Sequence, residues 1–229
     1  MRIVEDLLKQ LIAPGRTVID VGCGTGGLIS SLSSRYRCIG IDPSRDTIDC
    51  ANQLASAVDF RQGTAAANAN AIMQADLVLL MDVIEHVEND RALLTDIVNA
   101  MRPGSLLLIA VPAGPELISL YDDLAGHFRR YDAKMLRAAC AGLPLRLRMI
   151  TGMKKRLYWL IRLIRVLRLI PGLRYTDVLQ DFAPLPRILN RCFYTIFAGE
   201  RTRICTDNRR NSLEDPKHCV SLLAVFERE

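Results

Sequence analysis

The most informative part of the sequence is residues 17–27, which read TVIDVGCGTGG. The apolar run at residues 17–21 predicts a buried strand, and the glycines at positions 22, 24 and 27 have the Gly-x-Gly-x-x-Gly spacing of a tight turn into a helix. Such a turn lets a nucleotide-like ligand approach the backbone closely. The glycine pattern alone does not identify the ligand, because a sharp strand-to-helix turn needs glycine with or without one.

Two acidic residues narrow the choice of ligand. Asp42 follows Gly22 by twenty residues, at the end of the next apolar run, where a carboxylate can accept hydrogen bonds from both hydroxyls of a ribose. Asp20 stands two positions before the first glycine and would repel the pyrophosphate of NAD, whereas it would attract a cationic ligand such as S-adenosylmethionine. An alternative role for Asp20 is to cap backbone amides of the turn, which is compatible with ligand binding.

Short apolar runs alternate with helical stretches along the chain, which is typical of a parallel sheet with crossover helices. The predicted strands cover residues 17–21, 37–41, 57–60, 76–81, 105–111, 145–150 and 219–226. A helix is predicted over residues 135–141. The stretch between the sixth and last strands is longer than a simple connection requires, so we expect residues 151–218 to form a separate helical cap.

Several segments together resemble the class I S-adenosylmethionine-dependent methyltransferase family. The likeness runs through residues 18–26, 39–44, 75–87 and 101–104, which read VIDVGCGTG, IGIDPS, ADLVLLMDVIEHV and MRPG. The resemblance implies an α/β fold with a Rossmann-like, seven-stranded, mostly parallel sheet and an antiparallel last strand. We therefore expect a cofactor-binding core over residues 1–150, the cap over residues 151–218, and a last strand that returns to the core over residues 219–229.

The resemblance also implies which residues hold S-adenosylmethionine. The methionine part would be held by Asp20, Gly22, Cys23 and Gly24, the ribose by Asp42, the adenine by Pro43, Thr64 and Ala65, and the sulfonium side would be lined by Asp82 and Val83. The family often has an acidic residue near the position of Thr64, so here the contact to the adenine amino group could fall to a backbone carbonyl.

Methyl transfer from a sulfonium is an in-line displacement, in which positioning and desolvation supply much of the rate and a base is optional. If the acceptor is a hydroxyl, a histidine could remove its proton, and the catalytic candidates are His86 and His127, which follow the fourth and fifth predicted strands. The segment around His127, GHFRRY, resembles the branch of the family that includes quinone-pathway and sugar-pathway enzymes. His127 could instead order its loop by a hydrogen bond to Asp122 or Asp123, and His86 could have a structural role beside Glu85.

Residues 153–170 predict a basic amphipathic helix that ends before Pro171. Residues 145–210 contain 15 Lys and Arg against 4 Asp and Glu, so this part carries a charge of +11 and the remainder −6. Three interpretations stay open for the helix: a lid packed on the core, a peripheral contact with an anionic membrane, or a dimer contact.

Composition argues against several classes of protein. No apolar stretch is long enough for an ordinary transmembrane span, and Glu5 and Asp6 fall where a secretory signal would be apolar, so we expect a cytoplasmic protein. The seven cysteines have no Cys-x-x-Cys spacing, so no metal is expected. A single tryptophan and 6% aromatic residues offer few stacking platforms for nucleic acid.

The sequence thus predicts an S-adenosylmethionine-dependent methyltransferase that acts on a small-molecule acceptor. Oxygen is the expected target atom, on an apolar or lipid-linked substrate. The alternatives are an NAD-dependent oxidoreductase, against which Asp20 argues, and an accessory subunit that binds the cofactor without turnover.

Overall fold

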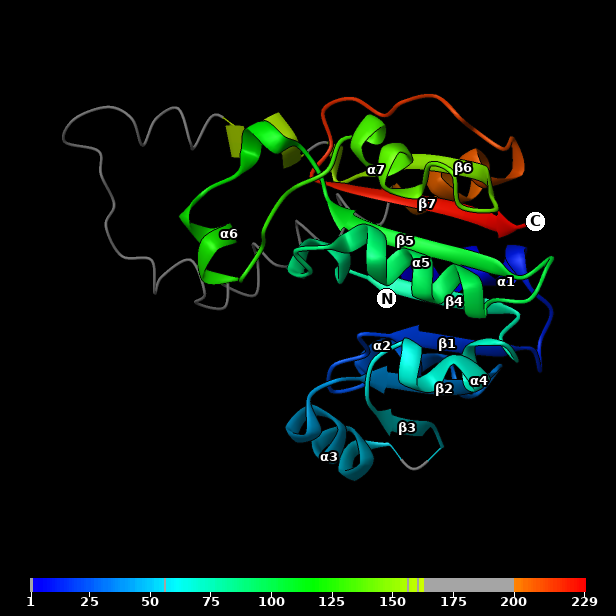
Figure 1. Ribbon diagram of the computed structural model, residues 1–229. Coiled ribbons are helices and arrows are strands. Elements are labelled where there is room, and N and C mark those ends of the chain that lie inside the picture. Colours follow the sequence, from blue (N-terminus) through cyan, green and yellow to red (C-terminus); the bar gives the residue numbers. More distant parts are fainter. Residues whose placement is uncertain (1, 56, 156, 160, 163–199) are drawn as a thin grey trace, which may run out of the picture.

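The computed structural model describes residues 2–55, 57–155, 157–159, 161–162 and 200–229, and its centre is one seven-stranded sheet with the order β3-β2-β1-β4-β5-β7-β6 (Figure 1). The strands are β1 (Thr17–Val21), β2 (Arg37–Asp42), β3 (Asp59–Gln62), β4 (Leu77–Met81), β5 (Leu106–Pro112), β6 (Leu145–Met153) and β7 (Ser221–Arg228). Strands β1 to β5 are parallel, and β7 is antiparallel to both of its neighbours, β5 and β6. The predicted Rossmann-like α/β sheet with an antiparallel last strand is confirmed.

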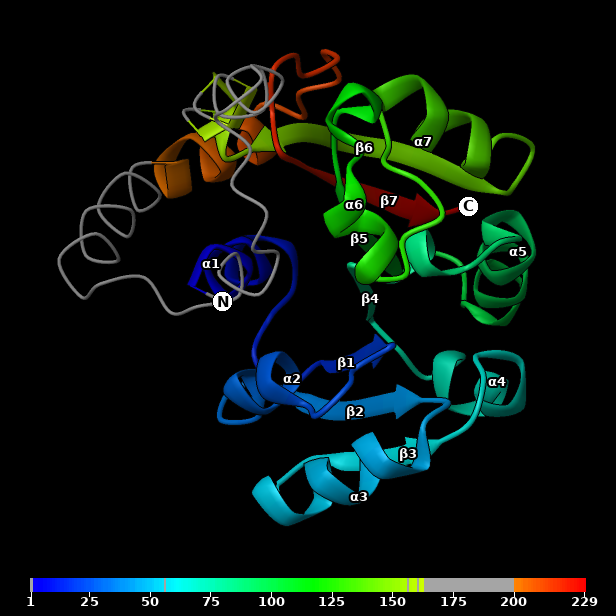
Figure 2. The ribbon, with the colours of Figure 1, turned by 90° about the vertical axis from the view of Figure 1, so that its left-hand side faces the viewer.

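Helices cover both faces of the sheet (Figure 2). They are α1 (Arg2–Leu11), α2 (Gly27–Leu32), α3 (Arg45–Leu54), α4 (Ala69–Ile72), α5 (Asp90–Ala100), α6 (Leu120–Leu124) and α7 (Ala133–Cys140). On one face α1, α2 and α3 bury Leu7, Ile29 and Ile48, and on the other α5 and α7 bury Ile97 and Leu136. Because the central strands are covered on both faces, they are almost continuously apolar, as in the fully buried β5.

Local hydrogen bonds explain where two of the helices begin. The Ser44 hydroxyl accepts a hydrogen bond from the Thr47 amide and starts α3. The Asp132 carboxylate accepts one from the Met135 amide at 2.7 Å and starts α7 at Ala133, so the predicted start at residue 135 is two residues late. The third strand is also shifted, to residues 59–62, because Phe60 pairs with Gly40 of β2.

The helix predicted over residues 153–170 differs at its start. Met153 is the last residue of β6 and pairs with Ser221, because β7 is long enough to extend β6 three residues beyond the expected end at residue 150. Lys154 then adopts a left-handed conformation with φ of 57°, and helical residues begin at 155. The part of the prediction over residues 163–170 lies outside the described residues.

The rest of the expected cap is described only near its end, where residues 200–209 are helical. Ile204 of this helix is fully buried against the same face of the sheet as α1. Within the described ranges, no helix combines the length and the apolar character needed to cross a membrane.

Candidate functional site

Three aspartates lie at the carboxyl ends of neighbouring strands. Asp20 and Asp42 belong to β1 and β2, and Asp82 directly follows β4. Since β1 pairs with both β2 and β4 in parallel, these ends meet at one edge of the sheet. Open α/β sheets bind ligands at this edge.

The glycine turn after β1 is built for close backbone approach. Gly22 and Gly24 have φ of 79° and 53°, a region that favours glycine. A Cβ at Gly22 would lie 2.6 Å from Cγ2 of Val83, whereas a Cβ at Gly24 would meet nothing within 4 Å. Gly22 is therefore required by packing against the loop after β4, and the Gly24 side of the turn is open to a ligand.

Asp20 is buried without a complete set of partners. Its side chain is only 3% exposed, and Oδ1 has no hydrogen-bond partner among the described residues. Burial, and to a smaller extent the charge of Asp42, raise the pKa of Asp20 to about 7. The capping role for Asp20 has no hydrogen bond to support it in the described part of the chain. An orphaned buried carboxylate beside an open glycine turn fits a cationic ligand group.

Asp42 is held firmly by the turns around it. Its Oδ2 accepts a hydrogen bond from the Gly24 amide at 2.9 Å, and its Oδ1 accepts from the Ser44 amide and the Thr47 hydroxyl, both at 2.9 Å. A carboxylate has about four lone-pair sites, so capacity remains for a ligand hydroxyl. The turn and the end of β2 are thereby fixed to each other around the place where a ribose would lie.

A pocket of about 420 Å³ with mainly apolar walls joins most of the other predicted cofactor residues. Its lining includes Gly22, Pro43, Thr64, Ala65 and Val83. The Thr64 hydroxyl accepts a hydrogen bond from the Ala67 amide at 3.2 Å, so this side chain serves the local turn. The structure thus brings the predicted adenine-flanking residues to one pocket beside the glycine turn, and Cys23 lies in the turn itself.

Sequence reasoning missed the part of this pocket that α5 supplies. Ala92, Leu93 and Asp96 of α5 line it together with Asn89. Only the 3.6-residue periodicity of α5 could have indicated them, and that pattern does not say which pocket a helix face borders. Asp96 places a carboxylate in the pocket wall that Thr64 does not provide.

Asp82 occupies a strained position at the end of β4. It is a non-glycine residue with φ of 55°, and its amide donates a hydrogen bond to the Ala110 carbonyl of β5 at 2.9 Å. Burial raises the pKa of Asp82, while Lys154, His127 and His86 act against that rise. The positive charges that act on this carboxylate come from residues that follow β4, β5 and β6.

His127 is oriented by a buried carboxylate. Its Nδ1 lies 2.9 Å from Oδ1 of Asp122, which is fully buried and also accepts from Nε of Arg130 at 2.7 Å. Burial alone would raise the pKa of Asp122, but the hydrogen bonds from His127 and Arg130 hold it below its usual value. Asp122, and not Asp123, is therefore the loop partner of His127. An Nδ1–H donated to Asp122 leaves Nε2 as the proton acceptor.

His86 lies beside His127, with the two ring centroids 4.7 Å apart, and its Nδ1 is 3.2 Å from the Gly126 carbonyl. The neighbouring Glu85 is fully buried, and neither of its carboxylate oxygens has a described partner. Burial raises the pKa of Glu85 to about 8. Ligand atoms of Glu85, His86 and His127 lie within 4.8 Å of one another, a grouping that could hold a metal ion and that the cysteine spacing gave no reason to expect.

Among curated proteins, the chain is similar to ubiquinone biosynthesis O-methyltransferases. The protein of that name from Rhizobium rhizogenes is 40% identical over 102 residues, which is 42% of this chain and 41% of the relative. The one from Cereibacter sphaeroides (strain KD131) is 38% identical over 110 residues, which is 45% of this chain and 44% of the relative. The chain thus matches less than half of the length of these relatives.

Solved structures share the fold of this chain, and a family model matches more than half of its length. The TehB-like S-adenosylmethionine-dependent methyltransferase from Corynebacterium glutamicum has a TM-score of 0.59 at 16% identity, covering 99% of this chain and 88% of that one. Phosphoethanolamine N-methyltransferase 2 from Haemonchus contortus, solved with S-adenosyl-L-methionine, has a TM-score of 0.56 at 16% identity, covering 99% and 52%. At these identities the likeness shows the fold. Residues 1–147 match the model of the methyltransferase domain, and the chain belongs to this methyltransferase family.

Proposed function

We propose that this protein transfers the methyl group of S-adenosylmethionine to an oxygen of a small-molecule acceptor with an apolar or lipid-linked body. The family match supports methyl transfer, and the two ubiquinone-pathway relatives support oxygen as the target atom. In this proposal Asp20, Cys23 and Gly24 hold the methionine part, Asp42 holds the ribose, and Asp82 and Val83 line the sulfonium side.

The observation that carries the proposal is the buried Asp20 carboxylate, whose Oδ1 has no partner among the described residues, beside the open glycine turn. An ionised carboxylate there would attract an ammonium group, and it would repel a pyrophosphate. This charge argument disfavours the NAD-dependent oxidoreductase. S-adenosylmethionine, when bound, supplies a methyl group on a positively charged sulfur, which needs no covalent intermediate with the protein.

The residues of the chain have three tasks in this reaction. The mainly apolar walls of the pocket beside Val83 and Leu93 would limit the contact of the bound cofactor with water, which favours displacement at the methyl group. Asp122 fixes the orientation of His127, so that Nε2 can take the proton of the acceptor hydroxyl as the methyl group is transferred. Arg130 pairs with Asp122 and keeps that carboxylate ionised.

A peripheral membrane contact through residues 153–170 would give access to a lipid-linked acceptor. Trp159 is 57% exposed, and the guanidinium of Arg162 lies 6.0 Å from its ring, a pairing suited to a lipid interface. Flotation with liposomes that contain anionic lipid, repeated after charge reversal at Arg162, Arg165 and Arg168, tests this contact. Flotation that depends on neither anionic lipid nor these charges would leave the lid or the dimer contact as the role of this segment.

Incubation of the protein with methyl-labelled S-adenosylmethionine and a panel of phenols, catechols and prenylated alcohols tests the activity. We expect label on the oxygen of at least one acceptor, and loss of that label in Asp20→Asn. Tight cofactor binding with no labelled product across the panel would favour the accessory subunit instead.

A further inference from the structure

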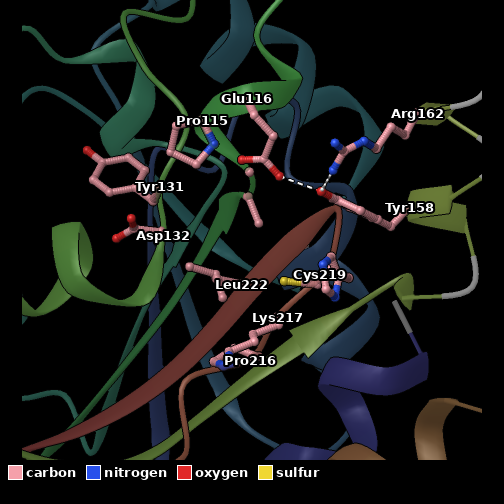
Figure 3. A pocket seen from close by; sticks show the side chains of 13 residues that line it. Pro115, Glu116, Tyr131, Asp132, Tyr158, Arg162, Pro216, Lys217, Cys219 and Leu222 are labelled. Atoms are coloured by element: carbon pink, nitrogen blue, oxygen red, sulfur yellow. Dashed lines mark hydrogen bonds between the residues drawn. The ribbon is translucent and has the colours of Figure 1, made fainter. Parts of the chain in front are cut away.

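A second cavity, of about 570 Å³, is bordered by the loop that follows β5 (Figure 3). Its walls come from four separate segments: the loop 113–116, the start of α7, the first turns of the helix after β6, and the loop before β7. It shares no lining residue with the pocket of about 420 Å³ beside the glycine turn. Its size is that of a site for a small organic molecule.

The two acids of this cavity already have partners. The Tyr158 hydroxyl donates a hydrogen bond to Oε1 of Glu116 at 2.6 Å, and Figure 3 shows this bond along one side of the cavity with Tyr131 and Asp132 opposite. Asp132 accepts the Met135 amide at the start of α7. The negative charges that border the cavity are therefore engaged in holding its walls.

The positively charged side chains of the cavity have fewer polar partners than the acids among the described residues. Within the described part of the chain, Arg162 makes one hydrogen bond, from Nη1 to the Tyr158 oxygen at 3.3 Å, and its guanidinium lies 6.0 Å from the Trp159 ring. Lys217 has no acidic partner among the residues that the structure describes, and the neighbouring His218 ring lies 5.1 Å from that of Tyr158. Pro115, Pro216 and Leu222 provide apolar surface between these groups. The cavity thus combines apolar walls with a cationic rim.

The cavity is connected to the proposed reaction site through the backbone of β5 and through Arg130. Arg130 donates to Oδ1 of Asp122, the partner of His127, and also to the carbonyl of Ala113 in the cavity wall at 3.2 Å. Asp82 bonds to Ala110, and Ala113 lies three residues further on, about 10 Å away in an extended strand. The loop after β5 therefore joins the wall of the cavity to the residues that bond Asp82 and orient His127.

We propose that this cavity is the acceptor subsite and that Arg162 and Lys217 bind an anionic group, a carboxylate or a phosphate, on an acceptor with an apolar body. The proposal rests on the proposed methyl transfer and adds the chemical class of its substrate. Cationic side chains give charge-assisted hydrogen bonds to such groups, and arginine can bind them with two nitrogens at once.

Methyl NMR of the full chain saturated with S-adenosylhomocysteine tests the location and the charge preference. Leu222 reports on the acceptor cavity and Leu93 on the cofactor pocket. We expect phenyl phosphate or benzoate to shift the Leu222 methyl signals, and to bind roughly tenfold or more tightly than the neutral benzyl alcohol. The phosphate and carboxylate probes distinguish the two anionic groups.

Single substitutions test whether Arg162 and Lys217 bind the anionic group. Arg162→Gln and Lys217→Gln should each weaken binding of the preferred anion roughly tenfold, whereas Arg45→Gln, an exposed change on α3, should leave it unchanged. Equal affinity for the neutral probe, insensitivity to both variants, or shifts confined to Leu93 would overturn the subsite. These titrations require no methyl transfer. Anion binding here, together with no labelled product in the acceptor panel, would therefore count against the proposed function and not against the subsite.

Discussion

Asp20 and Asp122 are both buried carboxylates near the carboxyl edge of the sheet, yet Asp20 Oδ1 lacks a described partner whereas Asp122 accepts several hydrogen bonds. The donors to Asp122 are the side chains of Ser119, His127 and Arg130 and the amide of Ser119. The pKa of Asp20 is raised, and that of Asp122 is lowered. Described residues of the fold therefore stabilise the charge of Asp122, whereas burial disfavours the charge of Asp20.

In the proposed function, Asp20 serves binding and Asp122 serves positioning. The buried Asp20 Oδ1, which lacks a described partner, costs stability in the free protein, and binding of a cation would remove that cost. Asp122 is paired in the free protein, and the proposed function gives it a role in the reaction only through His127. Substitution of Asp20 should therefore lower ligand affinity, whereas substitution of Asp122 should lower the free energy of unfolding.

The largest expected effect is on turnover in His127→Gln. Loss of a base that takes the acceptor proton should lower kcat roughly a thousandfold for whichever hydroxyl is methylated. Affinity for S-adenosylhomocysteine should stay the same, because His127 acts on the acceptor side. Measured kcat within about twofold of the wild type would remove His127 as the base and leave it as a loop-ordering residue.

The next effect is on stability in Asp122→Ala. Removal of this carboxylate leaves the buried Arg130 without its charge partner, and we expect a loss of about 3 kcal/mol in the free energy of unfolding. Asp123→Ala, at an exposed neighbouring position, should change it by less than about 0.5 kcal/mol. Chemical denaturation measures both, and equal small losses would contradict the structural role of Asp122.

Asp20→Asn should lower ligand affinity without lowering stability. The variant keeps the shape of the side chain and removes the charge, so affinity for S-adenosylhomocysteine should fall about a hundredfold. The free energy of unfolding should not decrease, since a buried carboxylate that lacks a full set of partners is replaced by a neutral amide. Asp49→Asn, exposed on α3, is the matched control for the titration. A destabilised Asp20→Asn with unchanged affinity would favour the capping role.

The pH dependence of stability and of ligand affinity gives a further test of the role of Asp20. Because the folded-state pKa of Asp20 is raised from 3.8 to about 7, its contribution to stability is present below pH 3.8 and is lost as the pH rises to about 7. The difference in unfolding free energy between the wild type and Asp20→Asn should change in that window by up to about 1.4 kcal/mol per pH unit. Affinity for S-adenosylhomocysteine should rise up to roughly tenfold per unit toward pH 7, and a flat profile in the wild type would contradict ionisation of Asp20 on binding.

Much of the sheet could be predicted because most of its strands are indicated by patterns within a few neighbouring residues. The apolar run before the glycine turn and the aspartates at strand ends have fixed spacing in the sequence, so β1, β2 and their edge were placed correctly. The start of the helix after β6 was wrong because the extension of β6 depends on pairing with β7, almost seventy residues later. Propensity within residues 153–170 carries no information about that pairing.

The acceptor side could be predicted only in part. The contact between His127 and Asp122 spans five residues, so the sequence offers it as one alternative, whereas the contact of Glu116 with Tyr158 spans 42 residues and has no sequence signature. The place of Asp96 in the pocket wall likewise depends on how α5 packs. Sites built from distant segments become visible only in the folded chain.

In the proposed function, Asp20 and the glycine turn bind a nucleoside ligand with a positively charged group in preference to a pyrophosphate-containing dinucleotide. Calorimetric titration of the wild-type protein with S-adenosylmethionine, S-adenosylhomocysteine and NADH, carried out in parallel at pH 7.5, tests it most directly. We expect S-adenosylmethionine and S-adenosylhomocysteine to bind and NADH to show no measurable binding. Binding of NADH alone would contradict the charge argument at Asp20 and replace the methyltransferase with an oxidoreductase.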